Sequence, residues 1–347
     1  MLLRLGVMVR VWAAAITVTL ARMRRGRGLP RWTWTHEVIL TGMKREFVRL
    51  APLSWSLQRR TWRAIALPSF AVRGARFERT RLAGMEAEWI TPRGVPRDPP
   101  TRDETVVLYL HGGAYLFGTI DEYRDFASRI AREAHARAIV LDYRLAPEHP
   151  FPAALDDAIA AYAALLASGI VAARVVVAGD SAGGGLTASL LVALRERGMP
   201  QPAGAVLVSP WVDLAARGGT LVTHQSHDFF SPELVEHWAR TVLGGADATD
   251  PRASPARADL HGLPPMLVQV GGAEMILDQV VAFADRARAG GVDARLRVWE
   301  DCFHDWPLFA AVLADGRGAV EEIGAFVREV TASGPRESRV GAGARAA

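Results

Sequence analysis

The chain has 347 residues, half of them hydrophobic and 22% charged, which is typical of a globular protein with a large buried core. Its one cysteine, Cys302, excludes both an intramolecular disulfide and a zinc site built from several cysteines. The net charge of +4 comes from the N-terminal segment, because residues 1–30 hold six arginines and no acidic residue. The rest of the chain has 35 of the 41 basic residues and all 37 acidic ones. It shows no basic stripe of the kind that binds nucleic acid.

The N-terminal segment is the first predicted element. Residues 11–21 form an uncharged stretch between arginines, and this stretch is short of the roughly 20 apolar residues that span a bilayer. The arginine-rich residues 22–27 follow without the small-residue cleavage site of a signal peptide. A cleaved signal peptide and a frayed terminus are alternatives, but we expect an interfacial or lid helix with three tryptophans nearby, Trp12, Trp32 and Trp34.

Residues 91–102 are dense in proline and glycine and predict a loop, after which the pattern changes. Short apolar runs then alternate with longer alanine-rich stretches, and the apolar runs lack a period of two, as strands buried on both faces do. We expect strands at 105–110, 138–143, 174–179, 205–209, 266–270 and 296–299. We expect helices at 121–134, 153–168, 182–197, 278–290 and 316–330. This alternation predicts an α/β fold, with a mainly parallel sheet and helices on both faces.

Residues 211–263 are the longest interruption of this alternation. They are too long for a plain crossover, contain an expected helix at 232–243, and indicate lid material over the C-terminal edge of the sheet. The tail at 332–347 is rich in Gly, Ala, Ser and Arg, and we expect it to be disordered.

The strongest functional motif is Gly-Asp-Ser-Ala-Gly at 179–183. It follows an apolar run and precedes an alanine- and leucine-rich one, which is the strand, turn and helix setting of a nucleophile elbow. Glycines two positions either side of the serine allow the sharp turn, and the helix start aims free N–H groups at a developing oxyanion. We therefore expect Ser181 to be the nucleophile of acyl transfer.

Upstream, His-Gly-Gly-Ala at 111–114 ends an earlier predicted strand. Adjacent glycines let backbone N–H groups approach a substrate oxygen closely. The alternative is a simple tight turn, with His111 as a structural hydrogen-bonding group. We expect an oxyanion hole built by the N–H groups of Gly112, Gly113 and Ala182.

A serine nucleophile needs a histidine base, which follows the serine and the acid in this chain order. Of the histidines after Ser181, only His304 follows the last predicted strand. His224 and His227 have a spacing that resembles a metal site, but they lack clustered acids or cysteines, and we expect no metal there. The orienting acid is expected after the strand at 266–270, where position leaves two carboxylates, Glu274 and Asp278.

The sequence resembles the hormone-sensitive lipase family of esterases over roughly residues 75–330. Six blocks in order carry the likeness: His-Gly-Gly-Ala-Tyr at 111–115, the Tyr-Arg-Leu-Ala-Pro block at 143–154, Gly-Asp-Ser-Ala-Gly-Gly at 179–184, Asp-Pro-Arg-Ala-Ser-Pro at 250–255, the Leu-Pro-Pro block at 263–271, and the His304 segment. In that family the acid usually opens an Asp-Pro-Leu block 30 residues before the histidine. The resemblance therefore favours Glu274 as the acid, with Asp278 as the alternative.

The resemblance also implies an eight-stranded mixed sheet with an α-helical cap. The cap would combine residues 1–75 with 211–263, and the catalytic domain would span 76–331. The usual third glycine after His111 is Ala114 here, which keeps its N–H. The 143–154 block looks structural, so we assign no chemistry to its charged residues, Arg144 and Glu148.

We therefore expect a cytoplasmic carboxylic ester hydrolase for short- to medium-chain acyl esters, without cofactor or metal. A lactone hydrolase and a non-catalytic small-molecule receptor are alternatives within the same fold. The expected partner is a small ester and not nucleic acid. Peripheral membrane contact through residues 1–30, an interaction protein held at a membrane by that segment, and a homodimer are further alternatives.

Overall fold

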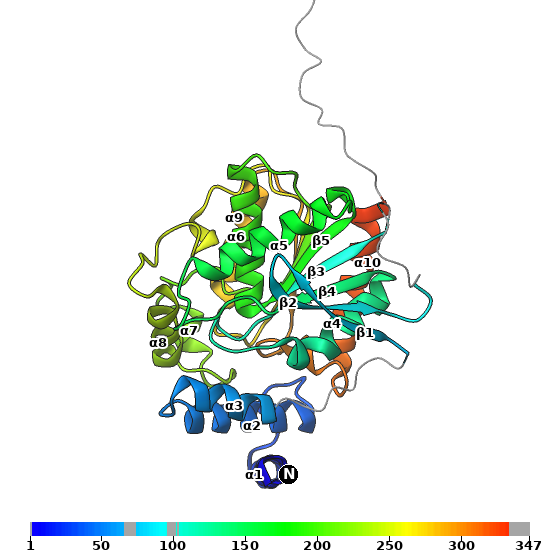
Figure 1. Ribbon diagram of the computed structural model, residues 1–347. Helices are drawn as coiled ribbons and strands as arrows, with labels where there is room; N and C mark the ends of the chain where they lie inside the picture. Colours follow the sequence, from blue (N-terminus) through cyan, green and yellow to red (C-terminus); the bar gives the residue numbers. More distant parts are fainter. Residues whose placement is uncertain (1, 66–73, 96–101, 103, 333–347) are drawn as a thin grey trace, which may run out of the picture.

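An eight-stranded sheet runs through the centre of the computed structural model, which describes residues 2–65, 74–95, 102 and 104–332 (Figure 1). The spatial order is β1-β2-β4-β3-β5-β6-β7-β8. Strands β3 to β8 pair in parallel, whereas β2 is antiparallel to both β1 and β4. The bounds are Arg76–Leu82 (β1), Met85–Thr91 (β2), Val106–Leu110 (β3), Arg137–Leu141 (β4), Val175–Asp180 (β5), Gly204–Val208 (β6), Met266–Gly271 (β7) and Ala294–Trp299 (β8).

The six strands expected from apolar runs are all present, within three residues at either end. Strands β3 to β7 are buried throughout, which explains why they lack a period of two. The hairpin β1–β2 was absent from those six, because charged residues interrupt both strands, and because β1 is an edge strand without a buried residue. The eight-stranded mixed sheet implied by the family resemblance is confirmed.

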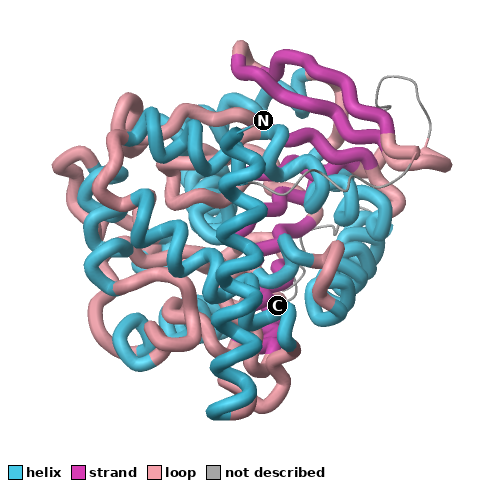
Figure 2. The backbone as a smooth tube through the Cα atoms, turned by 90° about the horizontal axis from the view of Figure 1, so that it is seen from below, coloured by secondary structure: helices cyan, strands magenta, loops and turns pink. Residues whose placement is uncertain are grey.

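Helices cover both faces of the sheet (Figure 2). On one face α4 packs beside α10 over one apolar cluster, and on the other face α5, α6 and α9 cover two more. The five helices expected after residue 105 are confirmed within two residues at each end. Their bounds are Ile120–Ala134 (α4), Ala153–Ala167 (α5), Ser181–Glu196 (α6), Leu277–Ala289 (α9) and Ala314–Ala332 (α10), with short 3-10 turns at Ala172–Arg174 (η1), Pro255–Arg257 (η2) and Trp306–Phe309 (η3).

Two segments far apart in the sequence form a helical layer that we call the cap (Figure 1). Its helices are Leu2–Arg25 (α1), Trp34–Leu50 (α2), Trp55–Ile65 (α3), Thr220–Thr223 (α7) and Pro232–Leu243 (α8). The N-terminal and inserted segments are joined by Lys44, whose Nζ donates to the carbonyl oxygens of Gln225 and Ser226. They are joined again by Phe47, whose ring stacks on that of Phe229.

Local sequence explains where α8 begins and ends. The side chain of Ser231 accepts the N–H of Leu234, Pro232 occupies the first helical turn, and Gly244 ends the helix in the left-handed conformation. The expected helix at 232–243 is confirmed at both ends. Of the other expectations for irregular segments, residues 96–101 of the predicted loop and 333–347 of the predicted tail lie outside the described residues.

The N-terminal segment forms the long helix α1, which packs on α2 and α3 through Ala14, Ala15 and Val18. Across the described part of the chain, no helix combines the length and the hydropathy that crossing a bilayer requires.

Candidate active site

Ser181 stands at the sharp turn between β5 and α6, with a positive φ of 49°. The turn explains the two glycines of the motif. A side chain on Gly179 would meet the carbonyl oxygen of Gly183, and a side chain on Gly183 would meet the carbonyl oxygen of Leu110. The strand, elbow and helix expected from the motif are therefore present, and they hold the serine hydroxyl at the carboxyl end of the sheet.

The ring of His304 lies between Ser181 and Glu274. His304 follows β8, and its Nε2 is 2.8 Å from the Oγ of Ser181. Its Nδ1 is 2.9 Å from Oε2 of Glu274, which belongs to the turn between β7 and α9. With Nδ1–H donating to the carboxylate, Nε2 is free to accept the serine proton. The structure thus brings together all three side chains that the sequence singled out.

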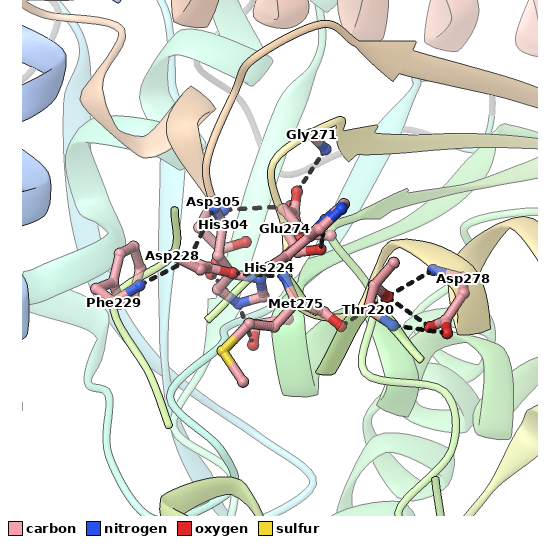
Figure 3. Close-up of polar contacts among 12 residues, drawn as sticks. Thr220, His224, Asp228, Phe229, Gly271, Glu274, Met275, Asp278, His304 and Asp305 are labelled. Atoms are coloured by element: carbon pink, nitrogen blue, oxygen red, sulfur yellow. Dashed lines mark hydrogen bonds and ion pairs between the residues drawn. The ribbon is translucent and has the colours of Figure 1, made fainter. Parts of the chain in front are cut away.

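The carboxylate of Glu274 is fully buried and held at both oxygens. While Oε2 accepts from His304, Oε1 accepts the backbone N–H of Gly271 at 2.5 Å (Figure 3). Oε1 also accepts the hydroxyl of Ser209 at 2.6 Å. Burial raises the pKa of Glu274, and the hydrogen bond from His304 opposes that rise. A carboxylate with three donors is a rigid support for an imidazole ring.

Asp278, the alternative acid, is directed elsewhere. Its carboxylate accepts the backbone N–H of Thr220 at 3.0 Å and the hydroxyl of the same residue at 2.7 Å (Figure 3). It lies in the first turn of α9 and ties that helix to α7 of the cap. The alternative that Asp278 orients His304 is wrong, because this side chain is committed to Thr220.

Asp305 is a site residue that the sequence prediction missed. Its Oδ2 is 3.2 Å from Nε2 of His304, on the same nitrogen that faces Ser181. The backbone of Asp305 is left-handed, with φ of 54°, and its N–H donates to the Oγ of Ser209 at 3.2 Å. The sequence signal that could have identified Asp305 is its position directly after His304.

These neighbours change the basicity of His304. Burial alone would lower its pKa, but the carboxylates of Asp305 and Glu274 outweigh that effect and raise the pKa well above its ordinary value. Burial also raises the pKa of Asp305, although the nearby imidazole lowers it. The imidazole therefore holds its proton more strongly than an isolated histidine does.

The structure corrects one expected member of the oxyanion hole. The N–H of Gly112 donates to Oδ1 of Asp180 at 2.9 Å, and the hydroxyl of Tyr109 donates to the same oxygen. The prediction for Gly112 is wrong, because this N–H is already bound to a buried carboxylate. Gly113 and Ala114, with φ of 103° and 55°, line the cavity beside the serine instead.

Ala182 lies in the first turn of α6, where backbone N–H groups have no partner within the helix. His111 has a structural position, as one of the two weighed interpretations held. Its ring stacks on that of Tyr143, its Nδ1 lies 2.8 Å from the carbonyl oxygen of Gly112, and burial lowers its pKa to about 4. A neutral imidazole at this point supports the loop after β3.

A cavity of about 520 Å³ extends from Ser181 and His304 into the cap. Helices α1 and α2 supply one wall through several residues, among them Val11 and Met43. Aromatic rings from the cap and from the loops beneath it contribute to the other walls: Trp62, Phe117, Trp211, Phe229, Phe230 and Trp238. Such a cavity favours an apolar guest beside a polar reacting group.

Other residues weighed in the sequence have structural surroundings. His224 approaches the carbonyl oxygen of Glu274 through Nδ1, at 3.0 Å, and no group of three or more potential metal ligands occurs among the described residues. Arg144 pairs with Asp157 in α5. Burial raises the pKa of the Cys302 thiol, which keeps it protonated.

Comparisons with known proteins identify the family of the chain. The sequence family described as the alpha/beta hydrolase fold matches residues 107–308, more than half of the chain. The chain belongs to the alpha/beta hydrolase family. Among solved structures, an esterase of the bacterial hormone-sensitive lipase family has a TM-score of 0.78 and 43% identity, covering 84% of this chain and 98% of its own.

Curated relatives of this alpha/beta hydrolase include an acetyl-hydrolase of Streptomyces hygroscopicus, 41% identical over 72% of this chain and 81% of its own length. An ethyl acetate hydrolase of Pseudomonas putida is 31% identical over 63% and 71% respectively. This alpha/beta hydrolase is therefore an ester hydrolase. The expected resemblance to the hormone-sensitive lipase family is confirmed, and the alternative of a non-catalytic receptor has no support.

Proposed function

We propose that Ser181, His304 and Glu274 form the catalytic triad of this ester hydrolase. The observation that carries the proposal is the pair of short contacts on one imidazole, 2.8 Å from Nε2 to the Oγ of Ser181 and 2.9 Å from Nδ1 to Glu274. Ser181 attacks the ester carbonyl carbon while Nε2 takes the hydroxyl proton. The imidazolium then protonates the leaving alcohol, which leaves an acyl-enzyme.

Hydrolysis of the acyl-enzyme repeats these steps with water. His304 removes a proton from the water, the water oxygen attacks the acyl carbon, and collapse of the tetrahedral intermediate returns the proton to Ser181. We assign stabilisation of the oxyanion to the N–H groups of Gly113, Ala114 and Ala182. Their support is the position of the loop after β3 on the cavity and the free first turn of α6.

The proposed substrates are carboxylic esters with short or medium acyl chains. A cavity of about 520 Å³ with aromatic walls supports an apolar guest of that size. The names of two relatives, an acetyl-hydrolase and an ethyl acetate hydrolase, also support small acyl groups as substrates. Lactones of similar size would meet the same nucleophile and base, so they form the second substrate class to assay.

A series of p-nitrophenyl esters of increasing chain length tests this proposal. We expect Ser181→Ala to lower turnover by about a million-fold and Glu274→Ala by about ten-thousandfold. Asp278→Ala is the matched control, and we expect it to retain most of the turnover. Substantial activity in Ser181→Ala would overturn the proposal, and a crippled Asp278→Ala with an active Glu274→Ala would overturn the assignment of the acid.

We also propose a domain assignment for the chain. Residues 76–331 would form the catalytic domain, while 1–75 and 211–263 would form the cap that shapes the cavity. In the cytoplasm, residues 1–30 would make peripheral contact with a membrane, supported by apolar side chains that α1 exposes to solvent. A homodimer through that face is the alternative, and the mass of the protein in vesicle-free solution distinguishes the two.

A further inference from the structure

The solvent-facing side of α1 is apolar, although a helix on a protein surface normally turns polar residues outward. Its inner face packs on α2 and α3 through small residues. Its outer face repeats large apolar side chains at intervals of three or four residues. Their exposed fractions are 62% for Val9, 66% for Trp12, 58% for Ile16, 51% for Leu20 and 79% for Met23.

Positive charge gathers at the C-terminal end of this apolar face. Arg24, Arg25 and Arg27 are exposed and, among the described residues, have no carboxylate partner. By contrast, Arg10 and Arg22 pair with glutamates of α2 and hold the two helices together. An apolar face bordered by unneutralised arginines is complementary to a bilayer with anionic headgroups, and it is poorly suited to a second copy carrying the same charges.

The same helix borders the cavity that contains Ser181. Arg10, Val11 and Ala13 of α1 line this cavity, and Val11 is itself 49% exposed. One side of α1 therefore forms the rim of the cavity while the adjoining side is free to contact lipid. An ester whose chain lies in the bilayer could reach the cavity along α1 without crossing bulk water.

We infer that α1 docks on an anionic membrane surface and that the cavity draws esters directly from that bilayer. The inference rests on the proposed ester hydrolysis at Ser181 and adds a substrate class, esters with an apolar chain dissolved in a membrane. It also explains why the cap contributes apolar side chains to two surfaces at once, the cavity wall and the outer face.

The test uses the full chain with vesicles of phosphatidylcholine, alone or mixed with phosphatidylglycerol, that contain a fluorogenic medium-chain ester that partitions into the bilayer. Soluble p-nitrophenyl butyrate is assayed in parallel. The outer face is changed by Ile16→Gln with Leu20→Gln and Met23→Gln, and the charges by Arg24→Gln with Arg25→Gln and Arg27→Gln. The matched control replaces two exposed valines of other elements, Val222→Gln in α7 and Val298→Gln in β8.

We expect the wild type to sediment with anionic vesicles. Each α1 variant should lose at least about tenfold in vesicle binding and in hydrolysis of the vesicle ester, while butyrate hydrolysis stays within about twofold. Equal hydrolysis of the vesicle ester by the variants, or equal binding to neutral vesicles, would overturn the inference. So would a wild-type dimer that the apolar variant turns into a monomer. If the wild type does not hydrolyse p-nitrophenyl butyrate, the proposed function is refuted instead. Vesicle binding would then still test whether α1 docks on the membrane.

Discussion

Replacing Asp305 with asparagine removes a negative charge from the side of His304 that faces Ser181. The nitrogen Nε2 lies 2.8 Å from the serine oxygen and 3.2 Å from Oδ2 of Asp305. A neutral Nε2 accepts the serine proton, whereas a protonated Nε2 donates to the aspartate, and one nitrogen cannot do both. Asp305 thus stabilises the imidazolium, the form of His304 that is unable to act as a base.

The size of the effect follows from the distance. Two unit charges 3.2 Å apart attract by about 5 kcal/mol at an effective dielectric constant of about 20. This attraction is the upper bound on what the charge of Asp305 adds to the stability of the protonated imidazole, and its direction is to raise the pKa of His304. Because burial raises the pKa of Asp305 and so reduces its charge, the full attraction is not realised, and we expect the acidic limb of kcat/KM to move by at least about one pH unit in Asp305→Asn.

The sign is set by the base form. A raised pKa of His304 means that wild-type activity increases only as pH rises through that raised value, so Asp305→Asn should move the acidic limb of kcat/KM to lower pH. The other groups facing this pair stay unchanged: Asp180, Asp228 and Glu274, with the hydroxyls of Tyr109 and Tyr123. Asparagine also tolerates the left-handed backbone, so the fold should be unaffected.

The assay is kcat/KM for p-nitrophenyl acetate from pH 5 to 10, followed by titration of the released acid. Asp278→Asn is the matched control, since it makes the same chemical change on a carboxylate bound to Thr220. We expect the control to keep the wild-type profile. An acidic limb that stays in place in Asp305→Asn, or that moves to higher pH, would refute the assigned electrostatic effect.

Three further variants test the support around the site. Ser209→Ala removes one of the two donors to Oε1 of Glu274, the proposed triad acid, and we expect kcat/KM to fall by about tenfold or more with KM little changed, as steady-state kinetics would show. Gly183→Ala forces a methyl group against the carbonyl oxygen of Leu110, so the midpoint of urea unfolding should fall by an amount equivalent to about 3 kcal/mol or more. Glu88→Gln weakens the buried pair with Arg124, whose two contacts are both 2.7 Å, and calorimetry should show a loss of about 2 kcal/mol or more with activity retained. Unchanged kinetics in the first variant or unchanged stability in the others would contradict these expectations.

The sequence predicted the parts of the fold that burial dictates. Strands covered on both faces show as apolar runs, and helix ends show through caps such as Ser231 and Gly244 of α8. The hairpin β1–β2 left no such signal, because charged residues interrupt both strands and β1, the edge strand, has no buried residue. Only the family resemblance implied those two strands.

The site shows the same limit at the scale of single residues. Position along the chain left Glu274 and Asp278 equivalent, and the family resemblance favoured Glu274. The structure separates them through the turn that aims Glu274 at His304 and the contact that binds Asp278 to Thr220. The error at Gly112 has a related cause. A glycine pair beside a strand predicts two accessible N–H groups, but nothing local reveals a carboxylate 68 residues away that accepts one of them.

Buried acids around one imidazole cannot all carry full charge, and their donors decide which of them takes a proton. Glu274 accepts from three groups, and Asp228 accepts the backbone N–H groups of Phe229 and Met275, so both are stabilised as carboxylates. Asp305 has His304 beside Oδ2, but its buried Oδ1 has no hydrogen-bond partner among the described residues. The acid with the fewest donors lies nearest the catalytic proton, so we expect a proton shared between Asp305 and His304 to determine the pH at which Ser181 becomes reactive.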